Sequence, residues 1–267
     1  VLGHLTWAML LKRESLSVLN SVYTFIREHY RTPAVLPREV LRELRIARAI
    51  LPLLRADVAM EWDPGVYCSD ASESGIGICR RHIAAEAVGD LGRVQEKWRF
   101  HTLGCISARR HALNIDPVVS NHEFLSDHID ETPPEVAEFC ESPADLLQPQ
   151  DWSCLHAGKI KQREHITRSE GRALIWAVAH HFRTIPRSRH RVLFLVDNMP
   201  LCLGSNRGRS SSPALFAVTR TLCAFALASG CKLTCRWVPS EFNPSDGPSR
   251  GKRPDGSPWR LHGPSPD

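Results

Sequence analysis

Four acidic side chains lie where predicted strands or helices begin or end, and they limit what this chain can fold into. The four are Asp70, Glu170, Asp197 and Asp246. Three follow strand-like stretches (66–69, 192–196 and 233–238), and Glu170 opens a predicted helix. Carboxylates brought together at strand ends repel one another unless a divalent cation lies among them. Hard oxygen ligands in this number suit Mg²⁺ or Mn²⁺, and paired ions of that kind serve phosphodiester chemistry.

The composition is that of a chain with a substantial core. Its 267 residues are 42% hydrophobic, which suits one domain with extensions. No apolar run approaches the length of a membrane span and no signal pattern opens the chain. We therefore expect an intracellular protein, cytoplasmic or nuclear, with no membrane partner. The first residue is Val rather than Met, so we expect a fragment of a longer polyprotein.

Cysteine and histidine spacings do not favour a zinc site. The nine cysteines include no CxxC pair, and their odd number favours a reducing compartment. Cys231 and Cys235 point to one face of a predicted strand, where we expect packing thiols. The adjacent His180 and His181 point about 100° apart on a helix. His122 and His128, in the acidic segment, have no useful spacing.

The charge is distributed unevenly. Between Arg110 and Lys159 there are ten acids and no Lys or Arg, whereas the rest of the chain has 34 Lys and Arg against 19 Asp and Glu. A basic body with one acidic segment favours a polyanionic partner. An ordinary solvated surface is the alternative.

Hydrophobic periodicity predicts a mixed α/β layer fold. Residues 1–61 are predicted to be helical, with an Arg-bearing helix at 36–54 whose basic face either contacts phosphates or is solvated. A turn at 62–65 precedes a predicted hairpin, and the segment at about 84–150 has the character of an insertion. Later strands are predicted near 152–166 and at 191–196 and 232–238. Helices are predicted at 170–182, capped by Ser169 or Thr167, and at 213–229, after a loop at 204–212. The tail, 251–267, is predicted to be disordered.

The ordered acids and their flanking residues resemble the ribonuclease H of retroelement reverse transcriptases. The resemblance rests on four stretches: 67–77 (Tyr-Cys-Ser-Asp-Ala-Ser-Glu-Ser-Gly-Ile-Gly), 169–174 (Ser-Glu-Gly-Arg-Ala-Leu), 196–198 (Val-Asp-Asn) and 239–250 (Pro-Ser-Glu-Phe-Asn-Pro-Ser-Asp-Gly-Pro-Ser-Arg). Each string alone is weak, but all four occur in the right order on the right elements. The last is most similar to tyrosine-recombinase (DIRS-like) retroelements.

The resemblance covers residues 62–250 and implies a ribonuclease H-like fold: a mixed five-stranded sheet flanked by helices. Residues 1–61 are similar to the stretch linking a reverse transcriptase's thumb to its ribonuclease H. The palm and fingers are absent, so the expected protein partner is a polymerase domain in the same or a related chain.

The implied activity is hydrolysis of the RNA strand of an RNA–DNA hybrid with two Mg²⁺ ions, or Mn²⁺. In the family pattern Asp70 bridges both ions, Glu170 and Asp197 complete the shell of the first, and Asp246 holds the second. Backbone amides near Ser72 and Gly75, together with Glu170 and Asn198, are candidates to read 2′-hydroxyl groups.

Basic residues after the third acid are the candidates for phosphate contacts. Arg207 and Arg209 are expected to contact the DNA strand, which would make binding depend on salt. The alternatives are that Asn198 only caps the following helix and that both arginines are solvated.

The chain departs from the family pattern at two places. The interval from Asp70 to Glu170 is long, which we attribute to the insertion. The loop before Asp246 lacks the His found in many relatives, which implies slow turnover, and Glu241 is more simply an exposed loop residue than its substitute.

Two further interpretations remain open. One is a decayed or tethering ribonuclease H-like module that binds nucleic acid or braces a polymerase without cleaving, although a tether has no chemical need for all four acids. The other is a DNA-cutting enzyme of the same superfamily, which the ending Asn243-Pro244-Ser245-Asp246 argues against.

Overall fold

The computed structural model describes residues 2–100, 139–160, 164–183, 189–210 and 212–252. Most of the predicted acidic insertion, with His122 and His128, lies outside these ranges, as does nearly all of the predicted tail. None of the helices within them is long and apolar enough to cross a lipid bilayer. The cysteines within them are free thiols, and most of them are buried.

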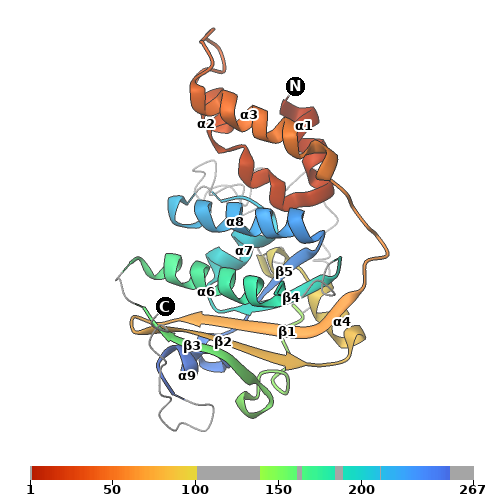
Figure 1. Ribbon diagram of the computed structural model, residues 1–267, viewed down its shortest axis with the longest axis vertical. Coiled ribbons are helices and arrows are strands. Elements are labelled where there is room, and N and C mark those ends of the chain that lie inside the picture. The colour runs from red at the N-terminus through yellow and green to blue at the C-terminus, as the bar shows by residue number, and fades with distance from the viewer. Residues whose placement is uncertain (1, 101–138, 161–163, 184–188, 211, 253–267) are drawn as a thin grey trace, which may run out of the picture. The chain divides into compact units, whose positions relative to one another are not determined.

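A mixed five-stranded sheet forms the centre of the fold (Figure 1). The strands are β1 (Trp62–Ala71), β2 (Gly75–His82), β3 (Ser153–Lys159), β4 (Arg191–Val196) and β5 (Lys232–Trp237). Their order across the sheet is β3-β2-β1-β4-β5. β1, β2 and β3 are antiparallel neighbours, while β4 is parallel to both β1 and β5. The predicted α/β class is confirmed, and the arrangement is consistent with a ribonuclease H-like fold.

Helices cover both faces of the sheet because successive strand residues point to opposite faces. Val192, Phe194 and Val196 face one core, which is covered by α6 (Ile166–His181), α7 (Met199–Arg207) and α8 (Pro213–Ser229). Leu193 and Leu195 face the other, which is covered by α4 (Ala85–Arg93) and residues 146–152. Both ends of the predicted insertion therefore belong to this second layer.

An N-terminal extension adds a third hydrophobic cluster around Met9, Leu19, Val22 and Val40. It consists of α1 (Leu2–Met9), a 3₁₀ segment (Leu10–Val18), α2 (Asn20–Glu28) and α3 (Arg38–Ile50). The remaining short elements are 3₁₀ turns at Leu51–Leu53, Glu96–Phe100, Pro149–Asp151 and Ser240–Phe242, and helix α9 (Asp246–Ser249).

Polar groups attach this extension to the body. Lys12 Nζ donates to the carbonyl of Cys231, and the Leu233 N–H donates to Glu14 Oε1 at 3.4 Å. Both contacts lie at β5, the edge strand. Glu43 accepts from the Val22 N–H at 3.0 Å and forms an ion pair with Arg220 of α8 at 3.4 Å. The extension thus covers an edge whose backbone groups would otherwise lack strand partners.

Three local predictions were wrong. Residues 62–65 are not a turn but the irregular start of β1, where the pairing with β4 shifts register and Asp63 Oδ1 accepts from the Gly65 N–H at 2.7 Å. α6 begins at Ile166, because His165 rather than Ser169 or Thr167 caps it. The expected loop at 204–212 is helical as far as Arg207, because Gly208 ends α7 with a left-handed φ of 70°.

Gly208, directly after α7, lies against the extension, and substitution at this position tests how tightly the two pack. A Cβ at this position would lie against the Arg13 carbonyl and 2.8 Å from Glu14 Cα, besides straining the positive φ. We expect Gly208→Ala to lower the free energy of unfolding by about 2 kcal/mol or more. Gly204→Ala, inside the same helix with no neighbour closer than 3.6 Å, should be neutral or stabilising by up to about 1 kcal/mol. Urea unfolding of both variants measures the difference, and equal effects would contradict the tight contact.

Candidate active site

The parallel pairing of β1 and β4 brings two of the four acids to the same edge of the sheet. Cys68 lies opposite Leu195 in this pairing. Asp70, near the end of β1, and Asp197, directly after β4, each lie two residues further along the chain, so both are at the carboxyl ends of neighbouring parallel strands. The Trp237 Nε1–H donates to the Asp197 carbonyl at 2.9 Å and holds that backbone in place.

The third acid comes from the helix that covers β1. Glu170 is the fifth residue of α6, whose inward face buries Ala173, Leu174 and Ala177 against the sheet. Glu170 therefore does not open the helix, as the sequence suggested, but lies in its second turn. Packing of α6 fixes the backbone from which the carboxylate extends.

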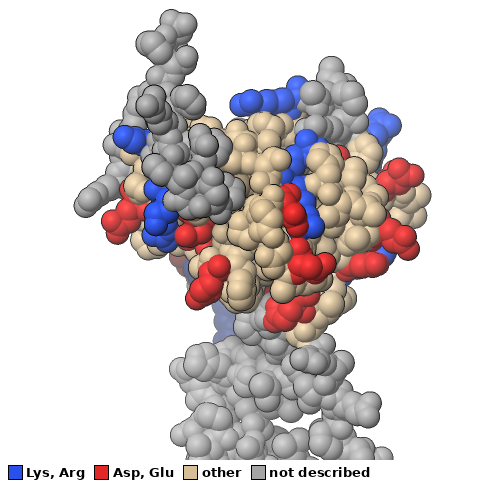
Figure 2. Space-filling view, turned by 90° about the horizontal axis from the view of Figure 1, so that it is seen from below, with Lys and Arg blue, Asp and Glu red and all other residues tan. Residues whose placement is uncertain are grey.

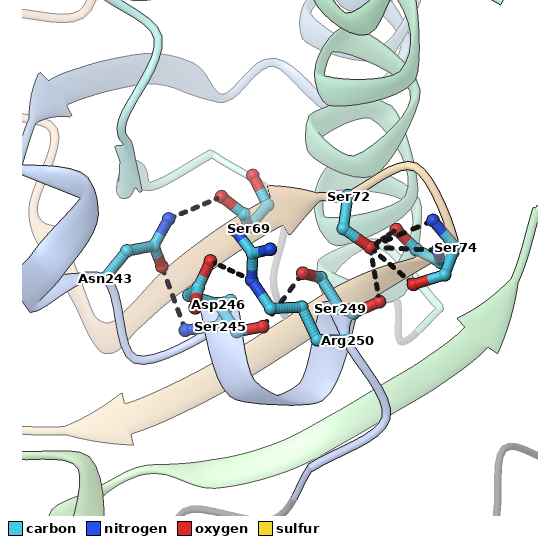
Figure 3. Close-up of polar contacts among 9 residues, drawn as sticks. Ser69, Ser72, Ser74, Asn243, Ser245, Asp246, Ser249 and Arg250 are labelled. Carbon is cyan, nitrogen blue, oxygen red and sulfur yellow. Dashed lines mark hydrogen bonds and ion pairs between the residues drawn. The ribbon is translucent and has the colours of Figure 1, made fainter.

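The fourth acid is carried by a segment hydrogen-bonded onto β1 (Figure 3). Asn243 Oδ1 accepts from the Ser245 N–H at 2.9 Å and from Cys68 Sγ at 3.0 Å. Ser245 Oγ donates to the Cys68 carbonyl at 2.9 Å, and Ser245 is fully buried. Asp246 follows directly as the first residue of α9.

Two glycines of β2 allow this segment to approach the sheet. A Cβ at Gly77 would meet the Ser245 carbonyl and would lie 2.7 Å from the Ser249 nitrogen. A Cβ at Gly75 would lie 2.6 Å from the Gly158 carbonyl oxygen and 2.7 Å from that of Ser249. These are backbone atoms of packed elements, so any larger residue would displace them.

Burial and mutual repulsion act on the acid at the centre. Asp70 is 4% exposed, and its Oδ2 is buried without a hydrogen-bond partner. Burial, and then the charges of Asp197 and Asp246, raise its pKa from 3.8 to about 7, although a hydrogen bond with Ser249 acts in the opposite direction.

The negative charges of neighbouring acids also act on Glu170. Burial, and then the charges of Asp197 and Asp70, raise its pKa from 4.5 to about 7, while a hydrogen bond with the Asn198 side chain lowers it. Its Oε2 is buried and has no hydrogen-bond partner. The carboxylates thus influence one another through their charges, and those of Asp70 and Glu170 bind protons near neutral pH.

The positively charged side chain of Arg250 lies next to these acids. Arg250 Nε donates to Asp246 Oδ1 at 2.8 Å, one helical turn along α9 (Figure 3). The charges of Asp70 and Asp197 also contribute to raising the pKa of Arg250. Arg250 belongs to the stretch that carries the family resemblance, and its spacing of four residues from Asp246 is the sequence signal for this ion pair.

The chemistry of the ligands fits a hard divalent cation, but the side chains do not form a complete coordination site. The bare buried oxygens of Asp70 and Glu170 are the kind of ligand that Mg²⁺ and Mn²⁺ prefer. Across the described ranges, however, no three His, Cys, Asp or Glu side chains converge closely enough to hold a metal ion. Binding would therefore require some of these carboxylates to turn toward the ion.

The predicted hairpin contacts to substrate have their donors occupied within the protein. The N–H groups of Ser74 and Gly75 donate to Ser72 Oγ at 3.2 and 3.1 Å, and the Ser72 N–H donates to the Gly75 carbonyl at 2.9 Å. Ser72 Oγ donates to the Ser249 carbonyl at 2.7 Å. Ser72 and Gly75 therefore hold α9 and the hairpin together.

The other predicted substrate contacts lie at the two ends of α7 and just after it. Asn198 Oδ1 accepts from the Leu201 N–H at 2.8 Å, so it caps this helix, and the same side chain hydrogen-bonds to Glu170. Arg207 ends α7 rather than lying in a loop, and Arg209 stacks over the ring of Tyr23 at 5.3 Å from its centroid. Both arginines are exposed.

The raised pKa of Asp70 has a measurable effect on stability. Because the folded-state value of about 7 exceeds the unfolded value of 3.8, stability falls as the pH rises between them. In EDTA at pH 8, Asp70→Asn should therefore unfold at a higher temperature than wild type. Its free energy of unfolding should be larger than that of wild type by about 2–4 kcal/mol at most. At pH 4 the difference should nearly vanish. Asp63→Asn, which removes a carboxylate that accepts a hydrogen bond from Gly65, should show no such gain; a pH-independent difference for Asp70→Asn would contradict the assignment.

Arg250 should compete electrostatically with an added cation. Arg250→Gln removes a positive charge next to Asp246, so we expect it to bind Mg²⁺ roughly two- to tenfold more tightly than wild type. Lys252→Gln removes the same charge two residues further along and should change the affinity less. Titration calorimetry at low salt measures both, and weaker binding by Arg250→Gln would show that the guanidinium supports the site instead.

No model of a known protein family matches this chain, and no curated protein matches it. Among solved structures, the chain is similar to a foamy viral protease-reverse transcriptase in complex with an RNA/DNA hybrid, with 11% sequence identity and a TM-score of 0.28. The match covers 86% of this chain and 44% of that one, so the chain spans less than half of the viral protein. A likeness this distant carries no argument about activity.

Proposed function

We propose that the protein hydrolyses the RNA strand of RNA–DNA hybrids, as the nuclease part of a retroelement reverse transcriptase. The observation that carries the proposal is the pair of bare, buried carboxylate oxygens on Asp70 and Glu170, within the field of Asp197 and Asp246. Such a cluster raises the free energy of the folded state unless a cation neutralises it. A cluster of this kind therefore favours a metal-dependent reaction as the function, and the strand order of the sheet supports the same function.

The four acids would hold two Mg²⁺ or Mn²⁺ ions. These ions would neutralise charge at the phosphate and lower the pKa of a bound water molecule. Asn198 would orient Glu170 from the start of α7, and Ser249 would orient Asp70 from α9. Because Asp70 and Glu170 bind protons with pKa values of about 7, cation binding displaces protons. Activity should accordingly rise as the pH increases from 6 to 8.

A non-cleaving role in nucleic-acid binding is the second candidate. It is favoured by the ion pair between Arg250 and Asp246, which satisfies one acid without a metal ion. It is also favoured because no three described ligand side chains converge on one point. In this case the protein would bind a hybrid and leave it intact.

A cleavage assay separates the two functions. With Mg²⁺, wild-type protein should cut the labelled RNA of a hybrid and spare single-stranded RNA and duplex DNA. Asp70→Asn should lower the cleavage rate by about 10³-fold or more, because it removes a charge from the centre of the cluster. Glu73→Gln removes an exposed acid three residues away in the hairpin and should retain full activity.

Circular dichroism of each variant shows whether the fold is retained. Cleavage that survives Asp70→Asn would rule out the assignment of the four acids. Binding of the hybrid without cleavage by any protein, in Mg²⁺ and in Mn²⁺, would favour the second candidate.

A further inference from the structure

A groove of about 840 Å³ lies where the N-terminal extension meets the sheet-covering helices. One wall comes from the 3₁₀ segment and α2, and the other from α7, the residues that follow it and the start of α8. The two walls are held together at Gly208, whose Cα faces the backbone of Arg13 and Glu14. The groove therefore exists only because the extension packs on the body.

The charge of the groove has one sign. Arg27, Arg207 and Arg209 line it and are exposed, and none of the described residues that line it is acidic. On the face shown in Figure 2, by contrast, Asp and Glu are spread among uncharged residues with Lys and Arg beside them. Three guanidinium groups around one hollow would repel one another, and an anion placed among them removes that repulsion.

Much of the rest of the lining is apolar, but it includes polar groups that suit a phosphodiester. Arg209 stacks over Tyr23, which directs its guanidinium across the groove from the side of α7 to the side of α2. Thr24 and Ser210 add hydroxyl groups to the lining. Guanidinium groups with hydroxyl donors are the usual contacts of proteins with phosphate oxygens.

The groove lies within reach of a strand held at the acids. α7 starts directly after Asp197 and Asn198, and its nine residues extend about 14 Å to Arg207. A nucleic-acid strand has one phosphate about every 3.4 Å along the helix axis, so this length corresponds to a few phosphates. A strand bound at the acids therefore has the arginines within a few nucleotides of it.

We propose that this groove binds the sugar–phosphate backbone of one strand of the hybrid, a few nucleotides from the acids, and that the extension contributes Arg27 to it. The inference rests on the proposed function for the identity of the strand. It assigns residues 16–27, which lie outside the ribonuclease H-like sheet, a direct part in substrate binding. Its contacts are to the backbone, so the groove selects no base sequence.

Binding of a fluorescein-labelled hybrid, measured by anisotropy over a range of salt concentrations, tests the proposal. The titrations use Asp70→Asn protein, so that the hybrid stays intact. Adding Arg27→Ala, Arg207→Ala and Arg209→Ala should raise Kd by about tenfold or more at 0.1 M salt and reduce the slope of log Kd against log salt by about 2–3. The matched control removes three exposed arginines that lie outside both the groove and α3, through Arg55→Ala, Arg183→Ala and Arg189→Ala.

The control protein has the same net charge as the groove variant and should change Kd by less than roughly threefold, because charges beyond a Debye length are screened. Equal weakening by both sets would overturn the groove, because net charge alone would then explain binding. As a second variant, Arg27→Glu alone should weaken binding more than Arg55→Glu. Thermal unfolding identifies any variant that fails to fold.

The groove and the proposed function can fail separately. If wild-type protein cleaves the hybrid while the groove variant binds as tightly as the control, the groove assignment is wrong and the nuclease assignment stands. If the groove variant loses binding while wild-type protein never cleaves, the groove stands and the nuclease assignment is wrong.

Discussion

The parallel pairing of β1 with β4 is the interaction on which the candidate site depends. It places the ends of two strands, distant in sequence, at one edge of the sheet, with Asp70 and Asp197 two residues beyond the paired Cys68 and Leu195. Hydrophobic side chains on both faces of these strands stabilise the pairing. The free energy gained by burying them offsets the repulsion between the acids, so the protein can keep a strained polar edge on a stable apolar sheet.

Much of the fold could be predicted from local patterns. The unbroken apolar run of β4 and the span of α8, bounded by Pro213 and Gly230, were predicted at their observed bounds. The errors came from competing local interactions. His165 replaced the expected serine or threonine cap, and Pro64 with its neighbours entered a strand because Asp63 satisfies the Gly65 N–H. Hydrophobic periodicity does not show which side chain will hydrogen-bond to a given backbone N–H, so it could not predict these two features.

The candidate site was predictable only where its residues lie in recognisable strings. The four acids could be named in this way, and their electrostatic coupling follows from the strand order. The roles of Ser72 and Gly75 could not, because their partners lie near residue 249, far along the chain. Likewise, nothing in the sequence near Arg27 indicates that it faces Arg207 and Arg209 across a groove. Contacts between distant segments depend on the tertiary fold.

The attachment of the extension at β5 affects how the protein could be divided. Lys12 and Glu14 supply the polar partners that a further strand would otherwise provide, and both are buried there. A shortened protein beginning at Trp62 would lose these partners at the start of β5, although Asn206 of α7 would still bind the N–H and carbonyl of Cys235. It would also expose the apolar surface of α8 that the extension covers, so this shortened form would tend to self-associate. The extension therefore covers the start of β5 and one side of α8, in addition to any part in binding nucleic acid.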